Sequence, residues 1–221
     1  MGGQRAARRS GTMRMAIIGS GNVGRALGRA AVRAGHEVTL SASRPEHAAE
    51  AASETGADAA EDNRAAVAAA DVIVLAVPGN AAVEVADEIA SAVAGKTVID
   101  ATNPLNGTFT DLIVKESSAA QEIQRHLPGA AVVKAFNTVF AARHGDPEED
   151  GVPLDALYAG DDTAAKETVA ALAESLGYRP VDAGGLRMAR ALEEMAFLNI
   201  TLNARGKLPW RSGWKLLGPI G

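Results

Sequence analysis

Three glycines near the N-terminus have the spacing of a phosphate-binding turn. Gly19, Gly21 and Gly24 follow the apolar run 15–18 and precede a helical stretch that ends before Gly35. In such a turn the first glycine permits a tight bend, the second lets the backbone approach a pyrophosphate, and the third lets the helix pack on the strand. N–H groups and the dipole at the helix N-terminus attract the phosphates. The predicted dinucleotide-binding turn consists of Gly19, Ser20, Gly21, Asn22, Val23 and Gly24. The alternative is a glycine turn that binds nothing.

The end of the next predicted strand indicates which dinucleotide binds. NAD enzymes place Asp or Glu there, about 20 residues after the glycines, to hold the ribose 2′-hydroxyl. This chain has Ser43 and Arg44 instead, and from Val38 onward its first carboxylate is Glu46. A hydroxyl donor and a fixed positive charge suit a 2′-phosphate. We therefore expect NADP, the alternative being that Arg44 is an exposed residue at the start of a helix.

Two further strand ends are expected to line the cofactor, because ligands of parallel sheets bind at the carboxyl ends of the strands. Ala76, Val77 and Pro78 end one predicted strand, and Asn103 follows the next. We expect these residues to lie along the ribose and nicotinamide. For Pro78 the alternative is a stiff turn into the following helix.

The elements that must position these residues follow from the apolar pattern. Short β-branched runs predict strands over residues 15–18, 37–40, 72–77, 97–99, 131–135, 154–158 and 179–181. Alanine-rich stretches between them predict helices over residues 22–34, 45–55, 81–94, 163–176 and 186–204. This alternation predicts an α/β fold, namely a doubly wound, mainly parallel Rossmann sheet with a helical C-terminal tail.

Composition limits the organisation and the partners. Residues 1–12 are Gly- and Arg-rich with few apolar side chains and are expected to form a disordered extension, whereas residues 13–221 are expected to form a single NAD(P)-binding Rossmann domain. The net charge of -5 gives no reason to expect nucleic acid or an anionic membrane as partner. No apolar run approaches the roughly 18 residues that cross a membrane. The chain has no cysteine, and we expect a cytoplasmic protein without a metal site.

Several segments occur in the order found in a known enzyme family. They are Ser43-Arg44, the run 71–78, the stretch Lys134-Ala135-Phe136-Asn137-Thr138 and the stretch 181–186. Together with the glycine turn they resemble the NADPH-dependent reductases of the deazaflavin coenzyme F420, which are also related to the N-terminal domain of membrane ferric reductases. The likeness covers nearly all residues from Met13 onward.

The resemblance implies an NADP-dependent oxidoreductase that forms a homodimer. It implies that hydride passes directly between the nicotinamide and coenzyme F420 or a flavin-like acceptor, and that Ser43 and Arg44 contact the 2′-phosphate. A flat acceptor ring needs an apolar face and hydrogen bonds to its carbonyl edge. The residues that the resemblance places around the acceptor are Asn103, Phe136, Asn137 and Thr138.

No catalytic constellation is evident, and hydride transfer between two organic cofactors does not need one. Of the four histidines, His144 lies nearest the expected cleft, and we expect it at a solvated helix end rather than on a substrate. Trp210 and Trp214 either stack on the acceptor ring or pack against a neighbouring subunit, the second being our expectation.

Two other functions stay open. An NADPH-dependent reductase of a small imine or carbonyl substrate has a similar N-terminal half, but it carries a large helical second domain that the residues after the last predicted strand are too few to build. A non-catalytic NADP(H)-sensing module would bind the dinucleotide without turnover. Consumption of NADPH with a deazaflavin, a flavin or an iron chelate distinguishes these functions.

Overall fold

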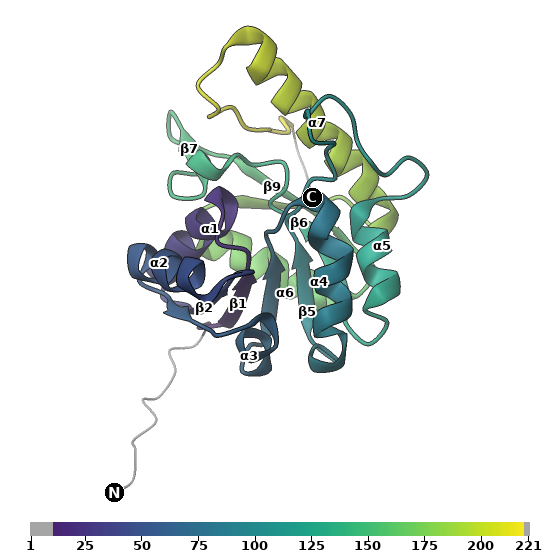
Figure 1. The fold of residues 1–221 in the computed structure, drawn as a ribbon. Coiled ribbons are helices and arrows are strands. Elements are labelled where there is room, and N and C mark those ends of the chain that lie inside the picture. The colour runs from purple at the N-terminus through teal and green to yellow at the C-terminus, as the bar shows by residue number, and fades with distance from the viewer. Residues whose placement is uncertain (1–10, 219–221) are drawn as a thin grey trace, which may run out of the picture.

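A central eight-stranded sheet organises the molecule (Figure 1). The computed structural model describes residues 11–218, so the predicted extension over residues 1–12 lies almost wholly outside the described residues. The strand order is β10-β9-β6-β5-β4-β1-β2-β3. The strands are β1 (Arg14–Ile18), β2 (Glu37–Ser41), β3 (Asp58–Ala59), β4 (Val72–Leu75), β5 (Thr97–Asp100), β6 (Ala131–Ala135), β9 (Asp155–Gly160) and β10 (Arg179–Asp182). Only the β6–β9 pairing of this sheet is antiparallel.

Helices cover both faces of the sheet, which confirms the predicted doubly wound fold. One apolar core packs α1 (Asn22–Arg33), α2 (Pro45–Thr55) and α6 (Thr163–Ser175) on one face. The other core packs α3 (Asn63–Ala68), α4 (Ala82–Ile89), α5 (Ala119–His126) and the start of α7 (Ala189–Gly206) on the opposite face. Figure 1 shows α7 above β6 and β9 at the top of the view, and this helix is the predicted helical C-terminal tail.

One predicted strand is shorter in the structure, and one predicted helix consists of three short helical elements. The strand predicted over 72–77 ends at Leu75, because the following turn leads into Pro78, which has no N–H to donate to a sheet. The helix predicted over 81–94 begins with the 3-10 turn η1 (Gly79–Ala81) and ends in η2 (Ala90–Ala92) around α4. The remaining short elements are η3 (Ala141–Arg143), η4 (Leu186–Met188) and the hairpin of β7 (Glu148–Glu149) and β8 (Val152–Pro153).

Two short helices, α3 and α5, are absent from the sequence prediction. Six and eight residues are too few to show a clear helical period. The capping residue at the N-terminus of each helix could nevertheless have indicated the helix from the sequence. Asp62 accepts a hydrogen bond from the backbone of Ala65, and Ser118 accepts one from the backbone of Gln121. Ser118 followed three residues later by glutamine has the spacing of a capping box.

The chain after α7 turns back towards β9. Lys207, the C-cap of α7, has a φ of +50°, and the backbone N–H of Asp155 donates to the carbonyl oxygen of Trp214 at 3.2 Å. Residues 214–216 thus lie beside β9, where Asp155 also contacts Lys215 and Leu216. Across residues 11–218, no helix is long and apolar enough to cross a membrane.

Candidate functional site

The turn after β1 has the geometry that the glycine pattern predicts. Gly19 has a φ of +117°, and a Cβ there would lie 2.4 Å from the carbonyl oxygen of Ala76. A Cβ on Gly24 would lie 1.8 Å from the carbonyl oxygen of Gly19, so α1 packs this closely only because the position is glycine. Gly21 has open space where a side chain would be, and it caps α1 without a side-chain hydrogen bond. The turn leaves room for a phosphate in front of the helix N-terminus.

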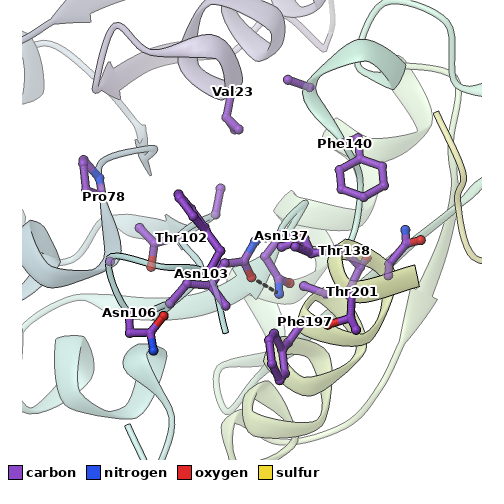
Figure 2. A pocket seen from close by; sticks show the side chains of 18 of the residues that line it. Val23, Pro78, Thr102, Asn103, Asn106, Asn137, Thr138, Phe140, Phe197 and Thr201 are labelled. Carbon is purple, nitrogen blue, oxygen red and sulfur yellow. Dashed lines mark hydrogen bonds between the residues drawn. The ribbon is translucent and has the colours of Figure 1, made fainter. Parts of the chain in front are cut away.

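A cavity of about 1160 Å³ opens beside this turn (Figure 2). The predicted cofactor residues in its wall are Asn22, Val23, Ala76, Val77, Pro78 and Asn103. Asn137 and Thr138, predicted for the acceptor, line it as well. Figure 2 shows Pro78 and Phe140 on opposite sides of the cavity, with Asn103 and Asn137 between them. The fold therefore brings the two predicted halves of the site together.

The other predicted cofactor residues lie outside the cavity wall. Gly19, Ser20, Gly21 and Gly24 belong to the turn itself, while Ser43 and Arg44 follow β2 at the surface. A hydrogen bond of 2.9 Å from the backbone N–H of Gly19 to the carbonyl oxygen of Ser41 joins the turn to the end of β2. The side chain of Arg44 is 62 % exposed; its Nε lies 3.6 Å from Glu46, and its guanidinium also contacts His47.

Phe136 lies elsewhere than we expected. The residue has a φ of +64°, and its ring is buried in the core rather than in the cavity wall. There it contacts the rings of His144 and Tyr178, each with its centroid 6.1 Å away. The reversal of the chain after β6 turns the ring inward, which strand alternation alone does not predict. The aromatic residues that do line the cavity are Phe109, Phe140, Phe197 and Trp210.

Sequence reasoning also missed Gly79. A Cβ on Gly79 would lie 2.5 Å from the carbonyl oxygen of Asn103, so this glycine lets the turn after β4 approach the loop after β5. The Pro78-Gly79 pair directly after a buried strand was the available signal. Thr102 lines the cavity one residue before the predicted Asn103.

Asn103 and Asn137 are joined by two hydrogen bonds at the base of the cavity, and we call this pair the asparagine clasp. The Asn137 side chain donates to the Oδ1 of Asn103, and the Asn103 side chain donates to the carbonyl oxygen of Asn137, both at 3.0 Å (Figure 2). The second amide hydrogen of Asn137 goes to the carbonyl oxygen of Leu192 on α7, also at 3.0 Å. This clasp fixes the loops after β5 and β6 to each other and to α7.

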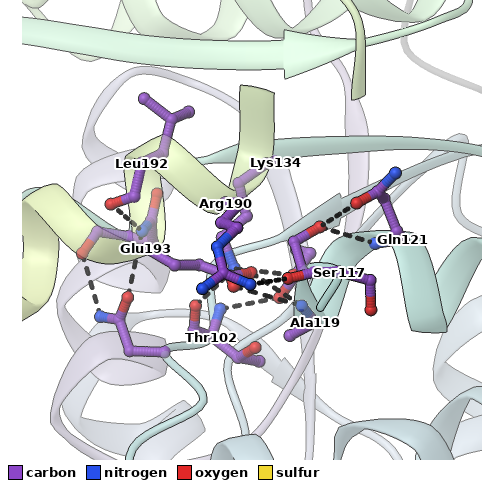
Figure 3. Close-up of polar contacts among 12 residues, drawn as sticks. Thr102, Ser117, Ala119, Gln121, Lys134, Arg190, Leu192 and Glu193 are labelled. Atoms are coloured by element: carbon purple, nitrogen blue, oxygen red, sulfur yellow. Dashed lines mark hydrogen bonds and ion pairs between the residues drawn. The ribbon is translucent and has the colours of Figure 1, made fainter. Parts of the chain in front are cut away.

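A buried ion-pair network lies behind the clasp (Figure 3). The Nζ of Lys134 on β6 is 2.8 Å from Asp100 on β5 and 2.9 Å from Glu193 on α7, and it donates to the carbonyl oxygen of Thr102 at 2.7 Å. Glu193 also accepts the backbone N–H of Ala119 at the start of α5, at 3.0 Å. The three charged side chains are almost completely buried. Their signal in the sequence was Lys134 inside one strand expected to be buried on both faces and Asp100 directly after another.

Burial and charge oppose each other within this network. Burial disfavours the ammonium of Lys134, but the two neighbouring carboxylates outweigh it and raise the pKa of this lysine. Burial raises the pKa of Glu193, with a further contribution from Asp100, and Lys134 offsets only part of that. The network thus ties α7 and α5 to the sheet at the cost of carboxylates held away from water.

His144 is not at a solvated helix end, which corrects the sequence expectation. The side chain is buried, and its Nδ1 lies 2.9 Å from the hydroxyl of Tyr178. Burial lowers the pKa of His144 to about 3. The residue does not line the cavity, so it belongs to the core under Phe136.

Known proteins are similar to this chain in sequence and in fold. The profile of the family described as NADP oxidoreductase, coenzyme F420-dependent, matches residues 14–104. The F420-dependent NADP reductase of Methanothermobacter thermautotrophicus is 35 % identical over 213 residues, which cover 89 % of this chain and 91 % of that enzyme. The chain belongs to the F420-dependent NADP reductase family. The family predicted from the sequence is thereby confirmed.

A solved structure extends the family likeness to three dimensions. A protein from Arthrobacter sp. FB24, assigned as an F420-dependent NADP reductase, is 30 % identical with a TM-score of 0.82, and the match covers 90 % of this chain and 96 % of that one. An imine reductase of Streptomyces aurantiacus shares the fold at 22 % identity and a TM-score of 0.66, but the match covers only 62 % of that chain. The family profile spans the glycine turn, Arg44, Pro78 and Asn103, whereas Asn137 and Thr138 lie beyond it.

Proposed function

We propose that this protein transfers a hydride between NADP(H) and a deazaflavin of the coenzyme F420 type. The observation that carries the proposal is the cavity beside the glycine turn, which joins the expected nicotinamide path at Pro78 to an apolar wall with Phe140 and Phe197. Relatives named F420-dependent NADP reductases match along 89 % of the chain, which supports the same pair of substrates.

On the dinucleotide side, we assign the pyrophosphate to the turn 19–24, because a Cβ on Gly21 would occupy otherwise open space there. Ser43 and Arg44 would hold the 2′-phosphate, and the stretch from Val38 to Arg44 has no carboxylate to hold a free 2′-hydroxyl. Ala76, Val77, Pro78 and Asn103 would guide the nicotinamide into the cavity.

On the acceptor side, Asn137 and Thr138 would border the second ring, and the aromatic wall would cover its face. NADPH supplies the hydride, and the acceptor ring takes it up together with a proton. The chain keeps both rings in contact and excludes water, for which an apolar wall is suited. A flavin has a similar flat ring and is the second acceptor that we propose.

Steady-state consumption of NADPH against a panel of acceptors tests this function. We expect turnover with deazaflavin, slower turnover with flavin, and none with small imines, ketones or hydroxy acids. Rapid reduction of an imine or ketone without response to any flavin-like acceptor would move the protein to the rival enzyme class. Tight NADPH binding without turnover of any acceptor would make it a sensing module.

We also propose that the protein acts as a cytoplasmic homodimer. Leu198 and Leu202 lie on α7 with 49 % and 51 % of their surface exposed, and a second copy is a suitable cover for this apolar face. NADPH is an intracellular cofactor, which supports the location. Sedimentation of the purified protein checks the assembly, and a monomer at all concentrations would contradict it.

A further inference from the structure

Trp210 is a large apolar side chain at the cavity that the described residues leave 45 % exposed. Its ring packs edge-on against Phe140, with centroids 5.4 Å apart and an interplanar angle of 77°. Two aromatic rings at such an angle form a corner in which one ring can stack on a flat ligand while the other contacts its edge. Trp210 reaches this place from the segment after α7, which we call the C-terminal strap (residues 207–218).

The strap holds Trp210 in an unfavourable backbone conformation. Lys207 and Trp210 have φ values of +50° and +56°, which side-chain-bearing residues adopt rarely and at a cost in free energy. Such conformations persist where the surrounding structure imposes them. The contacts of the strap therefore need to account for the position of Trp210.

The first anchor joins the strap to α7. Asn203 donates to the hydroxyl of Ser212 at 2.6 Å, and that hydroxyl donates to the Oδ1 of Asn199 at 2.7 Å. The side chain of Asn199 donates in turn to the carbonyl oxygen of Ser212 at 3.3 Å. Both asparagines are buried, so this anchor is shielded from water.

The second anchor joins the strap to β9 and β10. The carboxylate of Asp155, which is fully buried, accepts the backbone N–H of Leu216 at 2.7 Å and lies 3.1 Å from the Nζ of Lys215. Arg179 holds the same carboxylate with two contacts of 2.7 Å and donates to the carbonyl oxygen of Leu216. The strap is thus fixed on both α7 and the sheet, with Trp210 just before the first anchor.

We propose that Trp210 is a specificity-determining residue whose indole covers the face of a flat, polycyclic acceptor bound in the cavity. This inference rests on the proposed function, because it assigns the acceptor to the same cavity. The anchored strap fixes the indole beside Phe140, so the cavity favours extended aromatic rings over small carbonyl compounds. Asn199, Asn203 and Ser212 are positioning residues that act through the strap.

The test measures binding and turnover separately, with the oxidised deazaflavin as the probe. Trp210→Ala is expected to weaken deazaflavin binding to the NADP-loaded protein about tenfold, and to raise the KM for this acceptor similarly. Trp210→Phe is expected to recover most of this loss. Ser212→Ala should cause a smaller change in the same direction. The affinity for NADPH and the unfolding temperature should stay unchanged in the Trp210 variants.

Trp214→Phe is the matched control, because this second strap tryptophan does not line the cavity. It should leave deazaflavin binding unchanged. Unchanged deazaflavin binding and KM in Trp210→Ala, while the wild type turns over, would overturn the inference and leave the proposed function standing. Trp210-dependent binding without turnover would support the inference and remove the proposed function. Absence of deazaflavin binding to the wild type would overturn both.

Discussion

The three glycines of the N-terminal turn are required for different physical reasons. Gly19 needs a left-handed backbone and a close approach to Ala76, and Gly24 needs contact with the backbone of Gly19. These two are demands of the fold itself. Gly21 has an ordinary φ and open space around it, so the fold itself does not require a glycine there, and we attribute this glycine to the proposed pyrophosphate.

This difference predicts separable effects of substitution. Gly21→Val should abolish dinucleotide binding while the protein stays folded, because the new side chain fills the space of the pyrophosphate. Gly24→Ala should instead lower the free energy of unfolding, since its Cβ would collide with the carbonyl oxygen of Gly19. Calorimetry with NADPH and thermal unfolding measure the two effects. Normal NADPH binding by Gly21→Val would mean that the pyrophosphate lies elsewhere.

Arg44 predicts the choice of dinucleotide. NADP(H) should bind at least about tenfold tighter than NAD(H), because one charge-assisted contact contributes about 1.5–3 kcal/mol. Arg44→Ala should remove most of this difference and leave NAD(H) affinity nearly unchanged. Arg64→Ala, which replaces an arginine that hydrogen-bonds the backbone of Glu88, is the control. Equal affinities for both dinucleotides in the unmodified protein would refute the assignment.

At the scale of elements, the sequence indicated least how α7 is attached to the sheet. The buried ion-pair network makes this attachment, which we call the α7 joint. Long elements with clear apolar patterns, such as α1, α2, α6 and β6, were predicted almost to the residue. The helices α3 and α5 were too short for a period. The joint uses Lys134, Asp100 and Glu193, which are far apart in the chain and reveal their partnership only in three dimensions.

Removal of the buried cation tests this joint. Lys134→Met should lower the free energy of unfolding by about 3–5 kcal/mol, because Asp100 and Glu193 would remain buried without their partner. Lys166→Met, which breaks the more exposed pair with Asp182, should change stability little. Chemical denaturation of both variants gives the comparison. Equal losses would show that the buried network has no special role in holding α7.

At the scale of the whole molecule, the residues that the sequence assigned to the dinucleotide lie around the glycine turn and the cavity, whereas those assigned to the acceptor line the cavity only in part. The dinucleotide half depends on one local turn and on strand ends whose edge is set by the parallel topology. The cavity wall that we propose for the acceptor is built from distant segments, which contribute Phe109, Phe140, Phe197 and Trp210. The spacing of residues in the sequence does not show that these segments come together. Phe136, which we expected at the acceptor, is buried in the core instead.

The core around Phe136 also predicts a pH dependence of stability. His144 stays neutral in the folded protein because burial lowers its pKa to about 3, whereas in the unfolded chain it binds a proton near pH 6.5. Stability from this group is complete above about pH 6.5 and is lost as the pH falls towards 3. The loss approaches about 1.4 kcal/mol per pH unit. In His144→Phe, urea denaturation between pH 7 and 4 should give a flatter profile. Parallel profiles for the two proteins would exclude this role.

The central claim is direct hydride transfer from NADPH to a deazaflavin, and isotope transfer tests it most directly. NADPH deuterated at either face of nicotinamide C4 is mixed with the protein and oxidised deazaflavin, and the reduced deazaflavin is analysed by mass spectrometry. We predict that one of the two isotopomers delivers its deuterium to a ring carbon of the acceptor without exchange with water. Loss of the label to solvent from both isotopomers, or oxidation of NADPH without labelled acceptor, would contradict the account.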